Sequence, residues 1–245
     1  MHALNGEEML VAWERLRERP GRVSAQESAV ALLALALPER SIGELASLPL
    51  AERNALLLEL RVGTLGRRME GFATCPDCGA KLEFSLDARE LATGLRAQAP
   101  ETEDEWNGFT MRPVNTEDLL ACAEAEDDEL ACRILLARTL EGQLPQDERL
   151  GLQSLSALAY AALLERFERL NSAAEIRVQM HCAACQGTPL LDLDIARYLV
   201  REIAGAARRL MAEIHELAGA YGWSERSIAA MSGARRAAYM EMLSA

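Results

Sequence analysis

The sequence has almost no lysine and no long hydrophobic run, and each absence excludes a class of protein. Lys81 is the only lysine, and 38 acidic side chains outnumber 26 basic ones, so the formal net charge is -12. A protein that coats nucleic acid needs many cations against the phosphates, and this balance argues against that role. The longest apolar run, residues 29–37, is far shorter than the roughly 20 residues of a membrane-spanning helix. We therefore expect no membrane span.

The amino terminus lacks a secretory signal as well. Residues 1–8 contain neither a basic segment nor the apolar stretch that follows it in a signal peptide. The six cysteines are too few, in a chain this long, for a small secreted scaffold stapled by disulfides. We therefore expect a cytoplasmic protein.

Aromatic residues are scarce, at 4% of the chain, so the expected core consists mainly of Leu, Ala and Val. Leu and Ala favour helices. Ser24 and Ser41 each begin a capping-box pattern, and residues 195–220 carry an apolar stripe at helical spacing. Gly222 and Ser224 predict a helix stop, followed by a last helix that ends near Leu243. These patterns predict a mainly α protein.

Four of the six cysteines form two Cys-x-x-Cys pairs that stand far apart in the chain. The first pair lies in Cys-Pro-Asp-Cys-Gly and the second in Cys-Ala-Ala-Cys-Gln-Gly. Each pair is short enough for both sulfurs to reach one ion at about 2.3 Å, and four thiolates complete the tetrahedron of a structural zinc. We predict one structural Zn²⁺ held by Cys75, Cys78, Cys182 and Cys185.

Both pairs lie in similar surroundings. Apolar and polar residues alternate beside each pair, which predicts strands. Superposing Cys75 on Cys182 without a gap aligns Phe84 with Leu191 and Asp87 with Asp194, and a helical pattern follows each aspartate. Two such hairpins that share one zinc make a small β zinc ribbon, here split by a long insertion.

The whole chain therefore divides into five segments, with helical regions that flank and interrupt the split four-cysteine ribbon. We expect an N-terminal helical region at 1–66, the first half of the zinc ribbon at 67–90, an inserted helical lobe at 91–172, the second half of the ribbon at 173–194 and a C-terminal helical hairpin at 195–245.

The remaining candidates have simpler interpretations. Cys122 and Cys132 lie in a helical stretch, where a free cysteine packs as a small apolar side chain. His181 stands beside Cys182, but four thiolates leave it no place as a ligand. The acidic runs 101–105 and 124–129 are typical of solvated faces. The three histidines have no serine or acid at a spacing that predicts a catalytic triad, so we expect no catalytic residues and no small-molecule substrate.

Several segments together resemble the T4-type phage baseplate protein family, whose bacterial relatives occur with contractile injection systems and phage-tail-like particles. They are Leu-Pro-Leu-Ala-Glu-Arg-Asn-Ala-Leu-Leu-Leu-Glu-Leu-Arg at 48–61, the first knuckle at 75–79 with Leu-Glu-Phe-Ser-Leu at 82–86, the second knuckle, and His-Glu-Leu-Ala and Tyr-Gly-Trp-Ser at 215–218 and 221–224. The resemblance implies a non-enzymatic baseplate component or baseplate-hub assembly chaperone. Its partners would be hub, spike or wedge proteins, and the chain would act in the cytoplasm or within an assembled tail-like particle.

Two other functions remain open. A zinc-ribbon regulator that binds nucleic acid predicts a basic face on the ribbon, and the C-terminal turn at 221–224 allows a helix-turn-helix. Only Arg177 adds a basic side chain on the second half of the ribbon. A thiol oxidoreductase would use one Cys-x-x-Cys pair as a reversible disulfide in a protein without metal.

Overall fold

The structure, a computed structural model, is mainly helical, as expected from the composition. It describes residues 1–17, 24–98, 104–106, 109–141 and 156–244. The helices are α1 (Gly6–Arg17), α2 (Ala25–Ala36), α3 (Ile42–Ala46), α4 (Leu50–Leu65), α5 (Ala88–Ala97), α6 (Thr116–Ala121), α7 (Asp128–Thr139), α9 (Ala157–Asn171), the short 3-10 helix η2 (Ser172–Ala174), α10 (Ile195–Tyr221), α11 (Glu225–Ala229) and α12 (Gly233–Ser244). None of these helices is both long and apolar enough to cross a bilayer.

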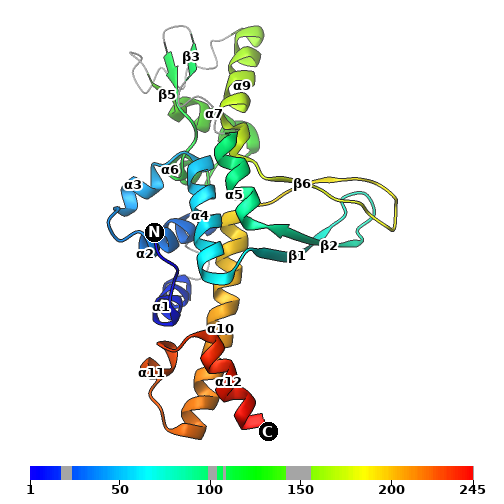
Figure 1. Ribbon diagram of the computed structural model, residues 1–245. Coiled ribbons are helices and arrows are strands. Elements are labelled where there is room, and N and C mark those ends of the chain that lie inside the picture. Colours follow the sequence, from blue (N-terminus) through cyan, green and yellow to red (C-terminus); the bar gives the residue numbers. More distant parts are fainter. Residues whose placement is uncertain (18–23, 99–103, 107–108, 142–155, 245) are drawn as a thin grey trace.

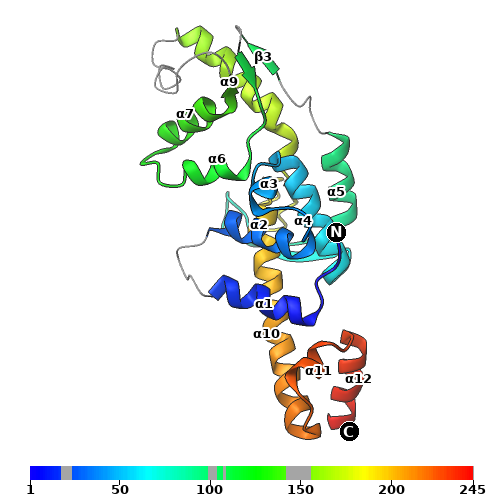
Figure 2. The ribbon, with the colours of Figure 1, turned by 90° about the vertical axis from the view of Figure 1, so that its left-hand side faces the viewer.

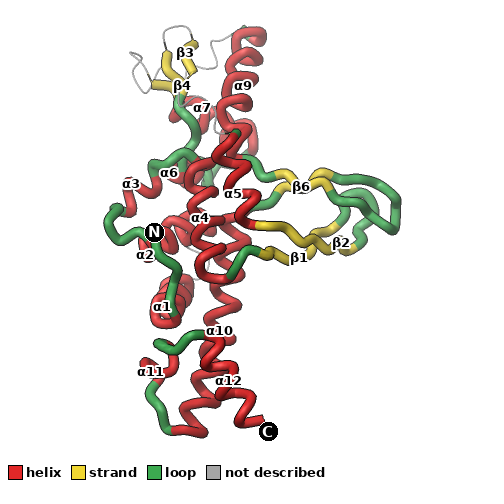
Figure 3. Tube along the Cα trace, in the orientation of Figure 1, coloured by secondary structure: helices red, strands yellow, loops and turns green. Residues whose placement is uncertain are grey.

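The strands form small antiparallel sheets. They are β1 (Arg68–Thr74), β2 (Lys81–Asp87), β3 (Asp104–Trp106), β4 (Phe109–Met111), β5 (Leu140–Glu141), β6 (Arg177–Gln179) and β7 (Leu190–Asp192). β1 pairs with β2, β6 pairs with β7, and β4 lies between β3 and β5. Figure 3 shows the two hairpins reaching sideways from the helices, with their loops at the end far from the body.

The largest core lies where α2, α4, α5 and α10 meet. Leu33, Leu57, Leu58 and Leu199 are fully buried there, and Met69 reaches it from the start of β1. The capping boxes at Ser24 and Ser41 are both confirmed and fix where α2 and α3 begin. α10 is a long helix whose 27 residues span about 40 Å. It runs from this core to the C-terminal helices (Figure 1).

The inserted segment lies at the end of the molecule opposite the C-terminal helices α11 and α12 (Figure 2). It has a hydrophobic core of its own. Apolar side chains from β4, β5, α7 and α9 form it, namely Met111, Leu136, Leu140, Leu163 and Leu170. Asp118 is fully buried beside them and pairs with Arg112 and Arg138. Burial raises the pKa of Asp118, but hydrogen bonds from Arg112 and the Asn115 backbone lower it below its ordinary value. The carboxylate therefore stays charged, and its ion pairs connect α6 to Arg112 and to Arg138 of α7.

The C-terminal end differs from the expectation. Gly222 ends α10 with φ +68° and Ser224 caps the next helix, as predicted, but that helix stops at Ala229. The prediction of one last helix is wrong, because Ser232 accepts a hydrogen bond from Arg235 N and starts α12. α11 packs on the first residue of α1, since a Cβ at Gly6 would lie 2.3 Å from the Ala229 carbonyl oxygen.

The two hairpins are equivalent in their strand register. Gly71 pairs with Phe84 in the first hairpin, and Val178 pairs with Leu191 in the second. Val178 stands 107 positions after Gly71, and Leu191 stands 107 positions after Phe84. The same offset relates Cys75 to Cys182. The internal repeat predicted from the cysteines is therefore confirmed in the backbone pairing.

The repeat also extends further than the sequence indicated. α4 begins at Leu50 and α9 at Ala157, again with the offset of 107, so that each hairpin is preceded and followed by a helix. Asp87 caps α5 and Asp194 caps α10. The copies differ in packing, because α4 lies against α5 in the main core whereas α9 joins the inserted lobe.

Two buried arginines connect the segments. Arg61 of α4 pairs through two nitrogens with Glu202 of α10 and donates to the carbonyl oxygens of Gly66 and Arg68, so it fixes the base of the first hairpin. Arg53 donates to Gln26, Asn54 and Thr116 and so joins α2, α4 and α6. Burial lowers the pKa of Arg53 to about 10, and the nearby charge of Asp194 only partly offsets this effect.

We expect that Arg61→Met lowers the free energy of unfolding by about 3 kcal/mol, because it leaves the Glu202 carboxylate without its ion pair and two carbonyl groups without the Arg61 donor. Glu70→Gln removes the exposed ion pair with Arg68 and should cost less than about 1 kcal/mol. Urea unfolding followed by circular dichroism measures both values. Equal effects of the two substitutions would contradict this role of Arg61.

Candidate metal centre

Each Cys-x-x-Cys segment folds into the same tight turn. Cys75 N donates to Ala80 O at 2.8 Å, and Gly79 N donates to Cys75 O at 2.9 Å. In the second turn Cys182 N donates to Gly187 O at 2.9 Å, and Gln186 N donates to Cys182 O at 2.8 Å. The two turns place both sulfurs of each pair on one side, as a metal-binding knuckle requires.

The structure brings together the four cysteines predicted from the sequence. Their sulfur atoms all lie within 4.8 Å of one another. The sulfurs of Cys75 and Cys185 are 3.8 Å apart, and those of Cys78 and Cys182 are 3.6 Å apart. Sulfurs at the corners of a tetrahedron around an ion at about 2.3 Å lie about 3.8 Å apart. The cluster could therefore hold one metal ion.

These distances do not correspond to disulfides. A disulfide needs about 2.05 Å between its sulfurs, and all four cysteines are free thiols. Both of the short contacts cross from one hairpin to the other, so the cluster joins the two hairpins.

The surroundings of the sulfurs favour thiolate at one position in particular. Backbone hydrogen bonds from Cys185 and Ala184 lower the pKa of Cys182 to about 7. A backbone hydrogen bond from Ala80 lowers the pKa of Cys78, but hydrogen bonds with the other three sulfurs, together with burial, raise it to about 12. Cys182 is therefore the thiol that ionises more readily, and a thiolate is the form that binds metal.

The cluster is half enclosed. Cys75 and Cys182 are buried, whereas Cys78 and Cys185 are exposed. Apolar side chains from both hairpins pack around the buried pair, namely Ala80, Leu82, Met180 and Leu191. A Cβ at Gly187 would lie 3.1 Å from the Asp77 carboxylate, so a glycine at this position lets the two knuckles approach closely.

The hairpins transmit the position of the cluster to the helices. β2 leads directly into α5, and β7 leads into α10 through the cap residue Asp194. The Tyr198 hydroxyl of α10 donates to Glu70 O of β1 at 2.8 Å, and its ring lies 6.2 Å from that of Phe84. A metal in the cluster would therefore fix the first hairpin relative to the start of α10.

The other candidates lie away from the cluster. His181 is exposed and contributes no atom to it, and Cys122 and Cys132 are half-buried, in the inserted segment. The acidic residues of 124–129 are exposed and gather into no metal-binding group in the described part of the chain. Residues 101–103 of the other acidic run lie outside the described residues. The packing interpretation of Cys132 is confirmed by its contact with the core of the inserted lobe.

Sequence reasoning missed one feature of the second knuckle. The residue after each second cysteine has a positive φ, +73° at Gly79 and +62° at Gln186. Glycine adopts this conformation freely, but glutamine does so at a cost. The gap-free superposition of the knuckles pairs these two positions and could have revealed the difference. Gln186 partly compensates through a hydrogen bond from its side chain to Ala183 O.

Four thiolates would fill the coordination sphere of an ion and leave no open position for a substrate or a reactive water. Such a centre can stabilise and orient, but it offers no site for Lewis-acid chemistry. Comparisons of the chain with family models, with curated proteins and with solved structures gave no match.

The pair of positive-φ positions allows a matched test of knuckle strain. Gly79→Gln should destabilise the protein by about 1 to 2 kcal/mol, because it introduces the left-handed conformation at a side-chain-bearing residue. Gln186→Gly should change stability by less than about 1 kcal/mol, since relief of strain offsets the lost hydrogen bond and the greater freedom of the unfolded chain. Urea unfolding of both variants checks this difference, and equal losses would argue against it.

Proposed function

We propose that this chain is a non-enzymatic assembly protein whose two hairpins are clasped by one structural zinc, and that it acts in the baseplate of a contractile phage tail or contractile injection system. The observation that carries the proposal is the convergence of four cysteine sulfurs from two hairpins far apart in the chain. The hairpins and the shared ion would together form a split zinc ribbon.

Zinc is the ion that fits the donor set best. Soft thiolate ligands select zinc, copper(I) or iron over calcium and magnesium, and four cysteines in a tetrahedron are typical of structural zinc sites. Free thiols at 3.6 and 3.8 Å across the hairpins match that geometry. A thiol oxidoreductase needs only one Cys-x-x-Cys pair, whereas here two pairs gather all four sulfurs within 4.8 Å of one another, which favours a metal clasp.

The clasp has a mechanical role in this proposal. Isolated two-stranded hairpins are marginally stable in water, so each needs the other and the ion between them. The free energy of metal binding then adds to the free energy of folding. Fixing the hairpins sets the direction of α10 relative to α4 and β1, and it thereby fixes the helical faces that a protein partner would contact.

The baseplate assignment rests on the resemblance of residues 48–61 and of the knuckles to the T4-type baseplate family. The expected partners are hub, spike or wedge proteins of the particle, either during assembly or in the finished baseplate. The net charge of -12 supports protein rather than nucleic acid as the partner. The exposed Met242 and Leu243 at the end of α12 suit an adaptable protein contact.

We expect the protein purified without added metal to contain about one zinc per chain. Cys78→Ser should reduce the zinc content at least tenfold and lower the melting temperature, because three thiolates and a hydroxyl bind zinc far more weakly. Elemental analysis by mass spectrometry measures the metal. Cys122→Ser removes a thiol outside the cluster and should leave the zinc content unchanged. Iron or no metal in the wild-type protein would overturn the zinc assignment.

We further expect the zinc-loaded protein to bind at least one hub, spike or wedge protein encoded beside it, and Cys78→Ser to weaken that binding more than Cys122→Ser does. Biolayer interferometry with each purified component provides the measurement. No affinity for any component would sink the baseplate proposal. Binding to duplex DNA that falls steeply with salt would instead revive the nucleic-acid-binding regulator.

A further inference from the structure

An open pocket with charged walls lies where the second hairpin joins the helices. Its volume is about 580 Å³, within the range of roughly 300 to 1,000 Å³ that is usual for small-molecule sites. Its walls come from α2, α4, α6, η2, β6, β7 and the first residue of α10. Part of the lining is apolar, namely Leu50, Leu119, Ile176, Leu190 and Leu193. The charged side chains decide what the pocket can select.

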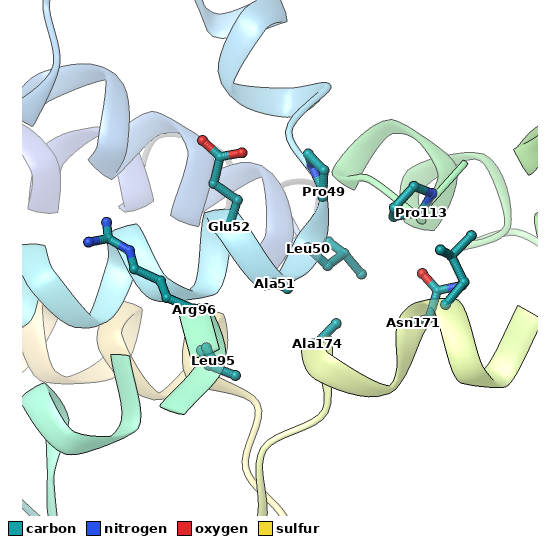
Figure 4. Close-up of a pocket in the computed structure, with 10 residues that line it drawn as sticks. Pro49, Leu50, Ala51, Glu52, Leu95, Arg96, Pro113, Asn171 and Ala174 are labelled. Atoms are coloured by element: carbon teal, nitrogen blue, oxygen red, sulfur yellow. The ribbon is translucent and has the colours of Figure 1, made fainter. Parts of the chain in front are cut away.

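A smaller pocket beside it lacks such charges. It has a volume of about 200 Å³ and shares Leu50 and Ala174 with the charged pocket (Figure 4). Its two charged residues, Glu52 and Arg96, already form ion pairs elsewhere in the chain. Figure 4 shows their charged ends turned away from the smaller pocket. That pocket therefore has no charge with which to select a ligand.

The charged pocket has a buried cation in its wall. Arg53 is only 3% exposed, and it donates from Nε, from both hydrogens of Nη1 and from one hydrogen of Nη2 to Gln26, Asn54 and Thr116. All three acceptors are neutral, and the second hydrogen of Nη2 has no acceptor among the described residues. Gln26 turns its amide oxygen to the guanidinium, which leaves its Nε2 hydrogens as further donors. This wall therefore suits a carboxylate.

The acidic side chains of the pocket differ in their partners. Glu175 forms an ion pair with Arg177. Asp194 caps α10, and its charge offsets that of Arg53 only in part. Asp192 is exposed and forms no ion pair with any residue that the structure describes. The pocket thus presents one partly compensated positive charge and one unpaired negative charge, on different walls.

This pattern distinguishes between classes of ligand. An inorganic anion would pair with Arg53 but would also meet both aspartates, and a simple cation would meet the arginine. A molecule that carries a carboxylate and an ammonium group can complement both signs, because each of its charges finds an opposite charge in the wall. The leucine side chains add a surface for an apolar portion of the same molecule.

We propose that this pocket binds the zwitterion of a free amino acid with an apolar side chain. The carboxylate accepts from Arg53 and Gln26, the ammonium group lies near Asp192 and Asp194, and the side chain contacts the leucines. The amino acid is bound here as a ligand and is not converted. The inference goes beyond the proposed function and does not depend on it, since neither the metal nor a baseplate partner enters the argument.

The test is a calorimetric titration of the protein, as purified, with L-leucine, N-acetyl-leucine and leucinamide. N-acetyl-leucine lacks the ammonium group, and leucinamide lacks the carboxylate. We expect saturable binding of leucine and about tenfold weaker binding of each derivative, because each loses one charge-assisted contact. Leucine should also raise the melting temperature, since it binds only the folded chain.

Two substitutions locate the site. Asp192→Asn removes the unpaired charge from an exposed position, and Gln26→Met removes the amide donor with little change in size. Each should weaken binding of leucine about tenfold. Glu83→Gln removes one charge from an exposed position on the first hairpin and should leave binding unchanged. Circular dichroism spectra that match the wild-type protein show that each variant is folded.

Four results would overturn the inference. They are the absence of saturable leucine binding, equal affinity for leucine and either derivative, binding that survives both Asp192→Asn and Gln26→Met, and tighter binding of inorganic phosphate than of leucine at the same residues. Equal affinity for a derivative would mean that only one charge is recognised. Tighter binding of phosphate would assign the pocket to a simple anion.

Discussion

The close approach of four sulfur atoms is the constraint on which the two hairpins depend. It fixes hairpin β1–β2 against hairpin β6–β7, which come from distant parts of the chain. The hairpins that carry them are short, two-stranded and separate from each other in hydrogen bonding. Such hairpins gain little stability on their own, so the apolar contacts of Leu82, Met180 and Leu191 help to hold them together, and an ion bound by the four sulfurs would add to these contacts. β2 continues into α5, and β7 continues into α10. The position of the sulfur cluster therefore also influences where the first turns of these two helices lie in space. A metal bound there would contribute its free energy to the whole fold rather than to a local loop.

The duplicated unit shows how one local pattern can serve two packing environments. The offset of 107 residues relates the starts of two helices, the strand pairs, the knuckle hydrogen bonds and the aspartate caps. Local hydrogen bonds thus reproduce the same hairpin twice. The copies diverge in the helix before the hairpin: α4 carries Leu57 and Leu58 into the main core, whereas α9 carries Leu163 and Leu170 into the inserted lobe. The exchange of glycine for Gln186 at the second positive-φ position is a further departure from the repeat, and it lies at the surface.

Buried polar groups connect the parts that the hairpins separate. Arg53 links α2 and α4 to α6 through hydrogen bonds to neutral acceptors, and Asn54 donates to Ala174 O in η2, directly after the inserted segment. Neutral acceptors satisfy the guanidinium while its charge stays only partly compensated, which is costly unless the geometry is well defined. This requirement favours one orientation of the inserted lobe on the core. An apolar pocket of about 200 Å³, lined by Leu50, Leu95 and Leu170 among others, lies beside the same junction.

The sequence by itself determined the local features: the helical class, the caps at Ser24, Ser41 and Ser224, the hairpin strands, and the four cysteines as one donor set. Each of these depends on residues close in the chain or on the chemistry of a single side-chain type. Only the tertiary structure decided the rest, namely the different packing of α4 and α9, the buried arginine contacts and the apolar pocket. These features arise from contacts between segments many residues apart. Periodicity shows which face of a helix is apolar, but only the packed chain shows which surface covers that face and where space remains between two cores.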